Sequence, residues 1–244
     1  MNQFRFRPVG SGGEMKSAVM NLIIINVIFF IATFFAQSKQ IDLGALLGLY
    51  HPLSPYFHWY QIFTCMFMHA NFMHLMFNML GLYFFGRMLE SVWGVKKFLI
   101  FYFVCGIGAS ITFLCWETFT AVQSLCGGSA GWNQLTEYMS NWQMVGQNFH
   151  ATYSLIYNPM VGASGAIFGI IMGAAMLFPN STIYLYMAIP VKIKLFALIY
   201  GVIELYKGTH TIQGDNTAHF AHLGGMLFGF IVIQIYKRDR NSFY

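Results

Sequence analysis

Apolar residues run through this chain in long blocks, each about as long as a helix that crosses a lipid bilayer. Such a helix needs about 20 mostly apolar residues, because each residue rises about 1.5 Å across a hydrocarbon layer of about 30 Å. Four blocks are long enough and carry no formal charge, and a fifth qualifies although it contains His74 and Asn78. The five predicted spans are Ser17–Ala36, about Phe72 to Gly86, Phe98–Trp116, Val161–Pro179 and Ala218–Tyr236.

A sixth block, Leu195–Tyr206, gives a weaker signal, since it is short, follows two lysines and contains Glu204. If it also spans the bilayer, successive loops alternate between the two sides. Of the 13 Lys and Arg residues, all except Lys39 and Lys207 then fall on the side of the amino terminus. Cytoplasmic loops carry an excess of Lys and Arg, so this distribution predicts six spans with both termini in the cytoplasm.

The composition agrees with a membrane protein. Of the 244 residues, 57% are hydrophobic and 9% charged, whereas a soluble domain carries about 25% charged residues. These values exclude a soluble domain, a disordered chain and a disulfide scaffold. In a membrane protein, the net charge of +5 bears on the orientation in the membrane and does not indicate nucleic acid binding.

The prediction is an all-α polytopic protein with six transmembrane helices. It has a cytoplasmic tail (1–16), a membrane domain (17–236) and a basic cytoplasmic tail (237–244). Its size and the lack of a targeting sequence favour a bacterial inner (plasma) membrane, and an organellar membrane stays open.

Polar side chains inside the spans are costly in hydrocarbon and therefore indicate function. They gather where the second, fourth and sixth spans begin. The second begins with His69, His74 and Asn78, the fourth with Ser164 between Gly162 and Gly165, and the sixth with His219 and His222. These three spans all run inward from the outer side. His74, Ser164 and His222 should therefore share one layer, on the order of 5–8 Å below the outer surface.

Glycines indicate that the fourth and sixth spans pack together. Gly165 and Gly169 repeat every four residues along the fourth span, and Gly225 and Gly229 do so along the sixth. Small residues at this spacing let two helices approach closely in lipid. Such packing would bring the hydroxyl of Ser164 toward the imidazole of His222. A hydroxyl beside a histidine base is an activated nucleophile.

The second span offers hydrogen-bond donors for an oxyanion. His74 and Asn78 are four residues apart and lie on one helical face, and the backbone N–H of Ser164 could add a third donor. Phe168 follows Ser164 by one turn and could stack on the His222 ring. No acidic residue is positioned in the sequence to orient His222, so we expect a dyad, not a triad.

Other chemistry fits the sequence less well. His69, His74, His219 and His222 could bind a metal, but their spacings are not those of a His-x-x-x-His pair, and no carboxylate or cysteine joins them at that depth. No metal and no cofactor is therefore expected. His-Glu-x-x-His, the motif of zinc metalloproteases, is absent, and all three Asp residues lie outside the spans, which excludes an aspartyl mechanism.

From about Gln61 to Tyr236 the chain resembles the rhomboid family of intramembrane serine proteases. The resemblance rests on four motifs in the family order. They are His74-x-x-x-Asn78, Gly86-x-x-x-Glu90-x-x-x-Gly94, Gly162-x-Ser164-Gly165 and His222-Leu-Gly224-Gly225. A departure is Tyr60-Gln61, where many members carry Trp-Arg in the first loop.

The resemblance implies a six-helix fold with Ser164 as nucleophile and His222 as general base. It implies an oxyanion hole of His74, Asn78 and the Ser164 amide, and His69 as a brace for the first loop. The substrates would be single-span membrane proteins within the lipid bilayer, with a small side chain before the cleaved bond. No nucleic acid partner is implied, and no oligomeric state follows.

Two alternatives stay open: a non-catalytic relative that binds transmembrane helices, and a His-based metal or proton transporter. For Glu204 we expect a buried hydrogen bond, and for His219 and His150 structural roles. The sequence gives no role to the long loop 117–160 and does not show whether Cys65 and Cys126 pair.

Overall fold

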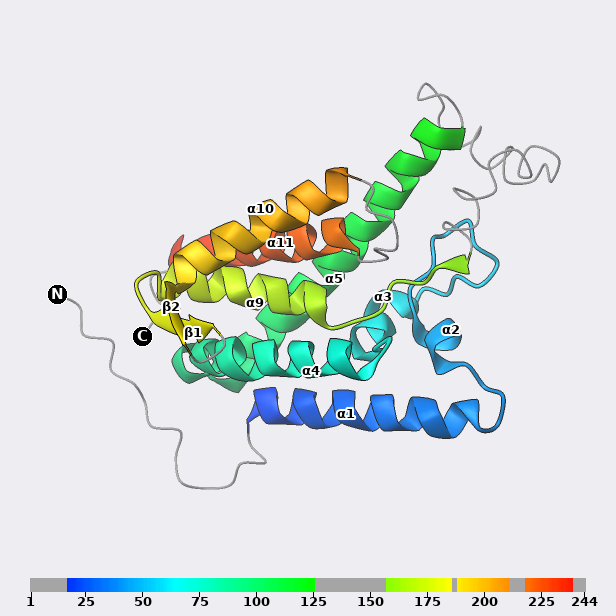
Figure 1. Ribbon diagram of the computed structural model, residues 1–244, viewed down its shortest axis with the longest axis horizontal. Helices are drawn as coiled ribbons and strands as arrows, with labels where there is room; N and C mark the ends of the chain where they lie inside the picture. Colours follow the sequence, from blue (N-terminus) through cyan, green and yellow to red (C-terminus); the bar gives the residue numbers. More distant parts are fainter. Residues whose placement is uncertain (1–16, 126–156, 186–187, 211–217, 239–244) are drawn as a thin grey trace.

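A computed structural model describes residues 17–125, 157–185, 188–210 and 218–238, and this part of the chain is mainly helical (Figure 1). Its longer helices are α1 (Ala18–Gln37), α4 (Phe72–Gly81), α5 (Arg87–Leu125), α9 (Ser164–Leu177), α10 (Ile193–Thr209) and α11 (His219–Arg238). Shorter elements are α2 (Leu43–Leu47), α3 (Gln61–Thr64), the 3₁₀-helix η2 (Cys65–Phe67), the π-helical turn η3 (Leu82–Gly86) and the strands β1 (Thr182–Leu185) and β2 (Ile189–Lys192).

The predicted spans Phe72–Gly86 and Phe98–Trp116 fall within one continuous helical stretch, in which η3 joins α4 to α5, and each of the other predicted spans corresponds to one helix. The main difference concerns α5, which begins at Arg87, breaks at Gly94 with a φ of 73°, and continues to Leu125. The helix therefore extends past Trp116, and the first part of the expected 117–160 loop is helical. The remainder of that loop, with Cys126 and His150, lies mostly outside the described residues.

The apolar helices are those of an integral membrane protein. Three helical stretches are long and apolar enough to cross a membrane, namely Ala18–Gln37, Phe72–Gln123 and His219–Arg238, and Ser164–Leu177 is apolar but shorter. Large apolar side chains are exposed on the outer faces, for example Phe35 (70%) and Leu198 (64%). Such faces are stable against lipid and costly in water. The count of six spans and the side on which the termini lie stay predictions.

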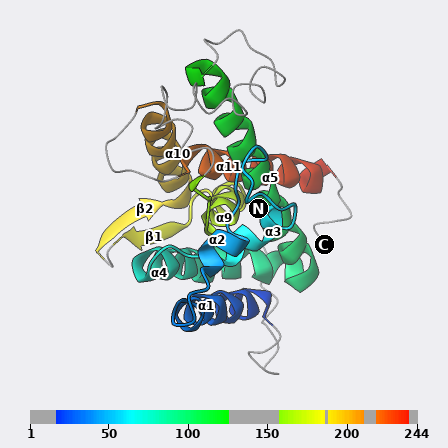
Figure 2. The ribbon, with the colours of Figure 1, turned by 90° about the vertical axis from the view of Figure 1, so that its right-hand side faces the viewer.

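Helix α9 lies at the centre of the bundle, with α4, α5, α10 and α11 around it (Figure 2). Nearly its whole circumference is buried, as expected for a helix that is apolar on all sides. In Figure 1, α4, α9 and α11 all run in the direction opposite to α1, α5 and α10. Their amino-terminal ends therefore meet at one end of the bundle, and the antiparallel β1–β2 hairpin lies at the other.

Helices α9 and α11 approach closely along their glycines. A β-carbon at Gly225 would overlap the carbonyl oxygen of Gly165, and one at Gly229 would lie 2.7 Å from the carbonyl oxygen of Gly169. No larger residue fits at these points unless the backbones move apart. The glycine spacing in the sequence indicated this contact, and it brings Ser164 beside His222.

Partly buried polar contacts hold the start of the first helix. The carboxylate of Glu90 accepts hydrogen bonds from the Ser17 hydroxyl (2.7 Å) and from the backbone N–H groups of Ala18 (2.6 Å) and Val19 (3.4 Å). These N–H groups have no partner within α1, so Glu90 caps the helix from α5. This contact gives a structural role to the Glu90 of the family motif.

Gln61 fixes the loop between α2 and α3. Its side-chain Nε2 donates to the carbonyls of Leu46 (3.2 Å) and Tyr56 (2.9 Å), and its Oε1 accepts from the N–H groups of Tyr50 (3.4 Å) and His58 (3.0 Å). The glutamine that departs from the family pattern thus joins four backbone groups of α2 and this loop.

The same loop carries a buried histidine. His51 is hydrogen-bonded to Thr118 of α5 at 2.9 Å. Burial lowers the pKa of His51 to about 4, so this loop is fixed to α5 by a neutral imidazole at neutral pH.

Candidate active site

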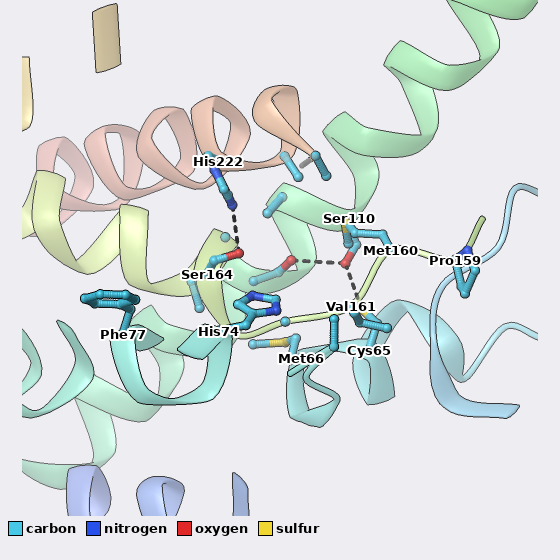
Figure 3. A pocket seen from close by; sticks show the side chains of 18 of the residues that line it. Cys65, Met66, His74, Phe77, Ser110, Pro159, Met160, Val161, Ser164 and His222 are labelled. Carbon is cyan, nitrogen blue, oxygen red and sulfur yellow. Dashed lines mark hydrogen bonds between the residues drawn. The ribbon is translucent and has the colours of Figure 1, made fainter. Parts of the chain in front are cut away.

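A cavity of about 690 Å³ lies at the end of the bundle where α4, α9 and α11 begin (Figure 3). Its walls come from the segment that leads from η2 into α4, the middle of α5, the segment before α9 and the start of α11. His74, Ser164 and His222 all line it. The topology therefore brings together three polar side chains that are far apart in the sequence.

Ser164 is the first residue of α9, and the glycine before it shapes the turn into the helix. Gly162 has a φ of 129°, which side chains rarely allow, and its N–H donates to the carbonyl of Cys65 at 2.9 Å. A β-carbon at Gly162 would also lie 2.8 Å from Nε2 of His74. Glycine is required here for both reasons. The backbone N–H groups of the first turn of α9 lack helical partners and can receive a negative charge.

His222 of α11 makes a hydrogen bond between its Nε2 and the Ser164 hydroxyl, with a length of 2.8 Å (Figure 3). Its ring lies flat on that of Phe168, with centroids 4.3 Å apart and an angle of 8° between the planes. The His222 side chain is largely buried. The structure thus provides the hydroxyl–imidazole contact and the stacking that the sequence led us to expect.

His74 and Asn78 lie differently with respect to the cavity. The His74 ring lies on the side of Ser164 opposite His222 (Figure 3), and the Asn71 side chain caps its helix by accepting from the His74 N–H at 2.9 Å. Asn78 is buried one turn further and is not among the residues that line the cavity. Its Nδ2 has no hydrogen-bond partner within the described part of the chain. His69 is buried with its ring edge-on to His74, at 5.2 Å.

Glu204 corrects the expectation of a dyad without an acidic neighbour. Its Oε2 atom lies 2.8 Å from Nδ1 of His222 and 2.7 Å from Nδ1 of His219. The expectation was wrong because α10 packs beside α11 and turns this carboxylate inward, a contact between helices that spacing does not reveal. The expected buried hydrogen bond of Glu204 is confirmed. The sequence did contain one indication of this role, the acidic residue itself, because a carboxyl group within an apolar span is a candidate functional residue.

The same contact changes the assessment of metal ligands. Glu204, His219 and His222 offer ligand atoms that all lie within 4.8 Å of one another. The expectation that no carboxylate joins the histidines is therefore also wrong. Each of these atoms is, however, already within hydrogen-bonding distance of another in the group.

Two further polar groups near the cavity have structural partners. Ser110 of α5 lines the wall, but its hydroxyl lies within hydrogen-bonding distance of the carbonyls of Ile62 (3.1 Å) and Gly106 (3.2 Å). The buried thiol of Cys65 is not in a disulfide and lies 3.7 Å from the Ile62 carbonyl and 3.6 Å from the Ser110 hydroxyl. Of the two serines that line the cavity in the described part of the chain, Ser164 is the one whose hydroxyl contacts a histidine.

Comparison with known proteins identifies the family of this chain. The model of the Rhomboid domain matches residues 56–239. The chain belongs to the rhomboid family.

Several relatives show similarity at low identity. Over 93% of its length the chain is 25% identical to RHOMBOID-like protein 12, mitochondrial, of Arabidopsis thaliana, and it spans 61% of that protein. It is 27% identical to Rhomboid protease AarA of Providencia stuartii over 87% of the chain and 70% of that protein. It is 32% identical to RHOMBOID-like protein 2 of Arabidopsis thaliana, over 70% of the chain and 40% of that protein.

Proposed function

We propose that this protein is an intramembrane serine endopeptidase that cleaves a peptide bond in or near the transmembrane helix of other membrane proteins. The observation that carries the proposal is the 2.8 Å hydrogen bond between Nε2 of His222 and the hydroxyl of Ser164 within the cavity. Family membership and the similarity to a bacterial rhomboid protease support it.

The mechanism follows from these two side chains. Ser164 attacks the carbonyl carbon of the substrate while His222 accepts the hydroxyl proton at Nε2. The resulting oxyanion lies near the first turn of α9, where the Ser164 N–H and the His74 ring can donate to it. His222 then protonates the leaving amine, which gives an acyl-enzyme on Ser164. Water, activated by the same histidine, hydrolyses this ester and restores the serine.

Asn78 acts differently in this proposal, because it lies one turn behind His74 and outside the cavity lining. Its unpartnered Nδ2 becomes an oxyanion donor when the bound substrate places an oxygen deeper in the site. His69 supports the His74 ring by edge-on packing.

The substrate must present an extended peptide to this site. In a helix the carbonyl groups are bonded and shielded, so a spanning helix must unwind locally before Ser164 can attack. Small or helix-breaking residues near the cleaved bond are therefore expected. Single-span membrane proteins are the proposed substrates, and the lipid bilayer is the setting in which enzyme and substrate meet.

The membrane setting is part of the proposal. The distribution of cations supports six spans with both termini in the cytoplasm, and the bacterial inner membrane is the proposed location. Relatives include bacterial, mitochondrial and chloroplastic proteins. Accessibility of single cysteines placed in the 1–16 and 237–244 tails to a membrane-impermeant reagent tests the orientation.

The test of activity is cleavage of a single-span reporter by the purified protein in reconstituted membranes. Ser164→Ala and His222→Ala should both abolish cleavage. Ser91→Ala is the matched control, because Ser91 bonds the Met88 carbonyl within α5 and is not in the cavity lining. Wild-type activity in either site variant would refute the mechanism. A non-catalytic, helix-binding relative would instead bind the reporter without cleaving it.

A further inference from the structure

Glu204 and Ser164 bond to opposite nitrogens of the same imidazole. The Glu204 Oε2 is 2.8 Å from Nδ1 of His222, and Nε2 of His222 is 2.8 Å from the Ser164 hydroxyl. The three side chains come from three helices, α10, α11 and α9. Glu204 and His222 are both largely buried. The contacts therefore form a continuous chain from a shielded carboxylate to the hydroxyl.

The carboxylate determines where the imidazole carries its hydrogen. An ionised carboxylate accepts hydrogen bonds and does not donate them, so the hydrogen of a neutral His222 ring must lie on Nδ1. Nε2 then has a free lone pair, directed at the Ser164 hydroxyl. This is the tautomer in which His222 can accept the serine proton. Without Glu204 the ring could carry its hydrogen on Nε2, where it blocks the reaction.

The same carboxylate opposes the charge that forms during attack. When His222 accepts the serine proton, it becomes a cation whose Nδ1–H faces Glu204. A negative charge at hydrogen-bond distance stabilises this cation more strongly in a site shielded from water than in solvent. Glu204 therefore favours the state that His222 reaches as Ser164 attacks.

Two neighbours fix the positions of the ring and the carboxylate. Phe168 stacks on the His222 ring and sets its plane. His219 bonds the same Oε2 atom of Glu204 through its own Nδ1, at 2.7 Å. The carboxylate is thereby held between two histidines from successive turns of α11. The His222 ring is left with one orientation.

We propose that Glu204 is a positioning residue for the reaction: it selects the productive tautomer of His222, stabilises its protonated form, and is itself held by His219. This inference rests on the proposed function and adds a third member to the pair of Ser164 and His222. The competing explanation is that Glu204 only joins α10 to α11 as a structural contact.

Glu204→Gln distinguishes the two explanations. The variant keeps size and shape, but its amide can donate to Nδ1 and so place the ring hydrogen on Nε2. We expect kcat for reporter cleavage to fall at least about 100-fold, the effect of holding a catalytic histidine in the wrong tautomer. KM should stay within about twofold and the Tm close to that of wild type, because the substrate does not touch Glu204. The rate at which a fluorophosphonate labels Ser164 should fall in parallel with kcat.

Three variants serve as comparisons. Glu204→Asp keeps the charge and should give a kcat between those of Glu204→Gln and wild type. His219→Gln leaves the Glu204–His222 bond in place and should lower kcat less than about tenfold, because His219 bonds Glu204, which in turn bonds His222. Glu117→Gln alters a partly buried glutamate of α5 that does not line the cavity, and should leave kcat unchanged.

The outcomes separate this inference from the proposed function. If the wild-type protein neither cleaves the reporter nor is labelled at Ser164 by the fluorophosphonate, both the proposed function and this inference fail. If wild type is active and Glu204→Gln has the same kcat, this inference alone is overturned. It is also overturned if Glu204→Gln lowers the Tm but leaves kcat per folded molecule unchanged, because Glu204 would then act only as a structural contact. Chelation should leave wild-type activity intact, and a chelator-sensitive activity would show that Glu204, His219 and His222 hold a metal instead.

Discussion

Gly225 of α11 lies directly against the backbone carbonyl of Gly165 in α9, with no space for a β-carbon between them. This contact sets the distance between the two helices that carry Ser164 and His222. Because Gly165 follows Ser164 and Gly225 lies one turn after His222, any separation here opens the hydrogen bond between serine and histidine.

Gly225→Ala should therefore destabilise the protein and reduce activity together. Overpacking of a tight contact costs about 1–3 kcal/mol, here because a methyl group overlaps the Gly165 carbonyl. The Tm in detergent and fluorophosphonate labelling of Ser164 measure the two effects. Gly201→Ala is the matched control on α10, since its β-carbon would meet the flexible end of Met226 at 3.3 Å. Equal behaviour of the two variants would contradict the importance of the α9–α11 contact.

Gly162→Ala should reduce both stability and activity. The residue would be held at a φ that disfavours side chains, and its methyl group would displace the His74 ring. Backbone strain of this kind costs about 1–3 kcal/mol, and each 1.4 kcal/mol lost from the transition state lowers the rate about tenfold. We expect cleavage to fall about tenfold or more. If the displaced ring is the cause, Gly162→Ala combined with His74→Ala should be no slower than His74→Ala alone.

Glu90→Gln tests the cap that α5 provides for α1. The amide has one acceptor oxygen and would direct its NH₂ group at backbone N–H donors, so buried donors lose their partner. Unsatisfied buried groups cost about 1–3 kcal/mol, and the Tm should fall accordingly, with kcat of the folded enzyme unchanged. Asp42→Asn is the control, because that exposed carboxylate caps α2 through one bond that asparagine can keep. An unchanged Tm in Glu90→Gln would show that the cap is unimportant.

Gln61→Leu tests how the loop between α2 and α3 is held. Leucine has a similar volume but makes none of the four hydrogen bonds to Leu46, Tyr50, Tyr56 and His58. Hydrogen exchange of backbone amides in 43–60 should speed up, while exchange in α9 and α11 should not. Gln37→Leu, at an exposed position on α1, should leave both unchanged. Protection of 43–60 equal to wild type would mean that other contacts, such as the hydrogen bond between His51 and Thr118, hold the loop without Gln61.

The sequence predicted where most of the long helices lie, though not how far α5 extends, and it predicted the contact between Ser164 and His222. Helices in lipid need long apolar runs, and glycines at intervals of four mark where two helices can touch. The sequence could not locate Glu204, because the rotation of α10 about its axis depends on packing against α11. It also could not locate Asn78 relative to the cavity, since a shared helical face with His74 does not mean equal depth in the wall.

The central claim is that Ser164 is a nucleophile activated by His222, and labelling by a fluorophosphonate tests it most directly. The measurement is mass spectrometry of the labelled residue in wild type, Ser164→Ala, His222→Ala and Ser91→Ala. We predict modification at Ser164 in wild type and in Ser91→Ala, none in Ser164→Ala, and a rate at least about 100-fold lower in His222→Ala, since general base catalysis supplies about 10²–10⁴-fold. Labelling of Ser164 at the wild-type rate without His222 would contradict the claim.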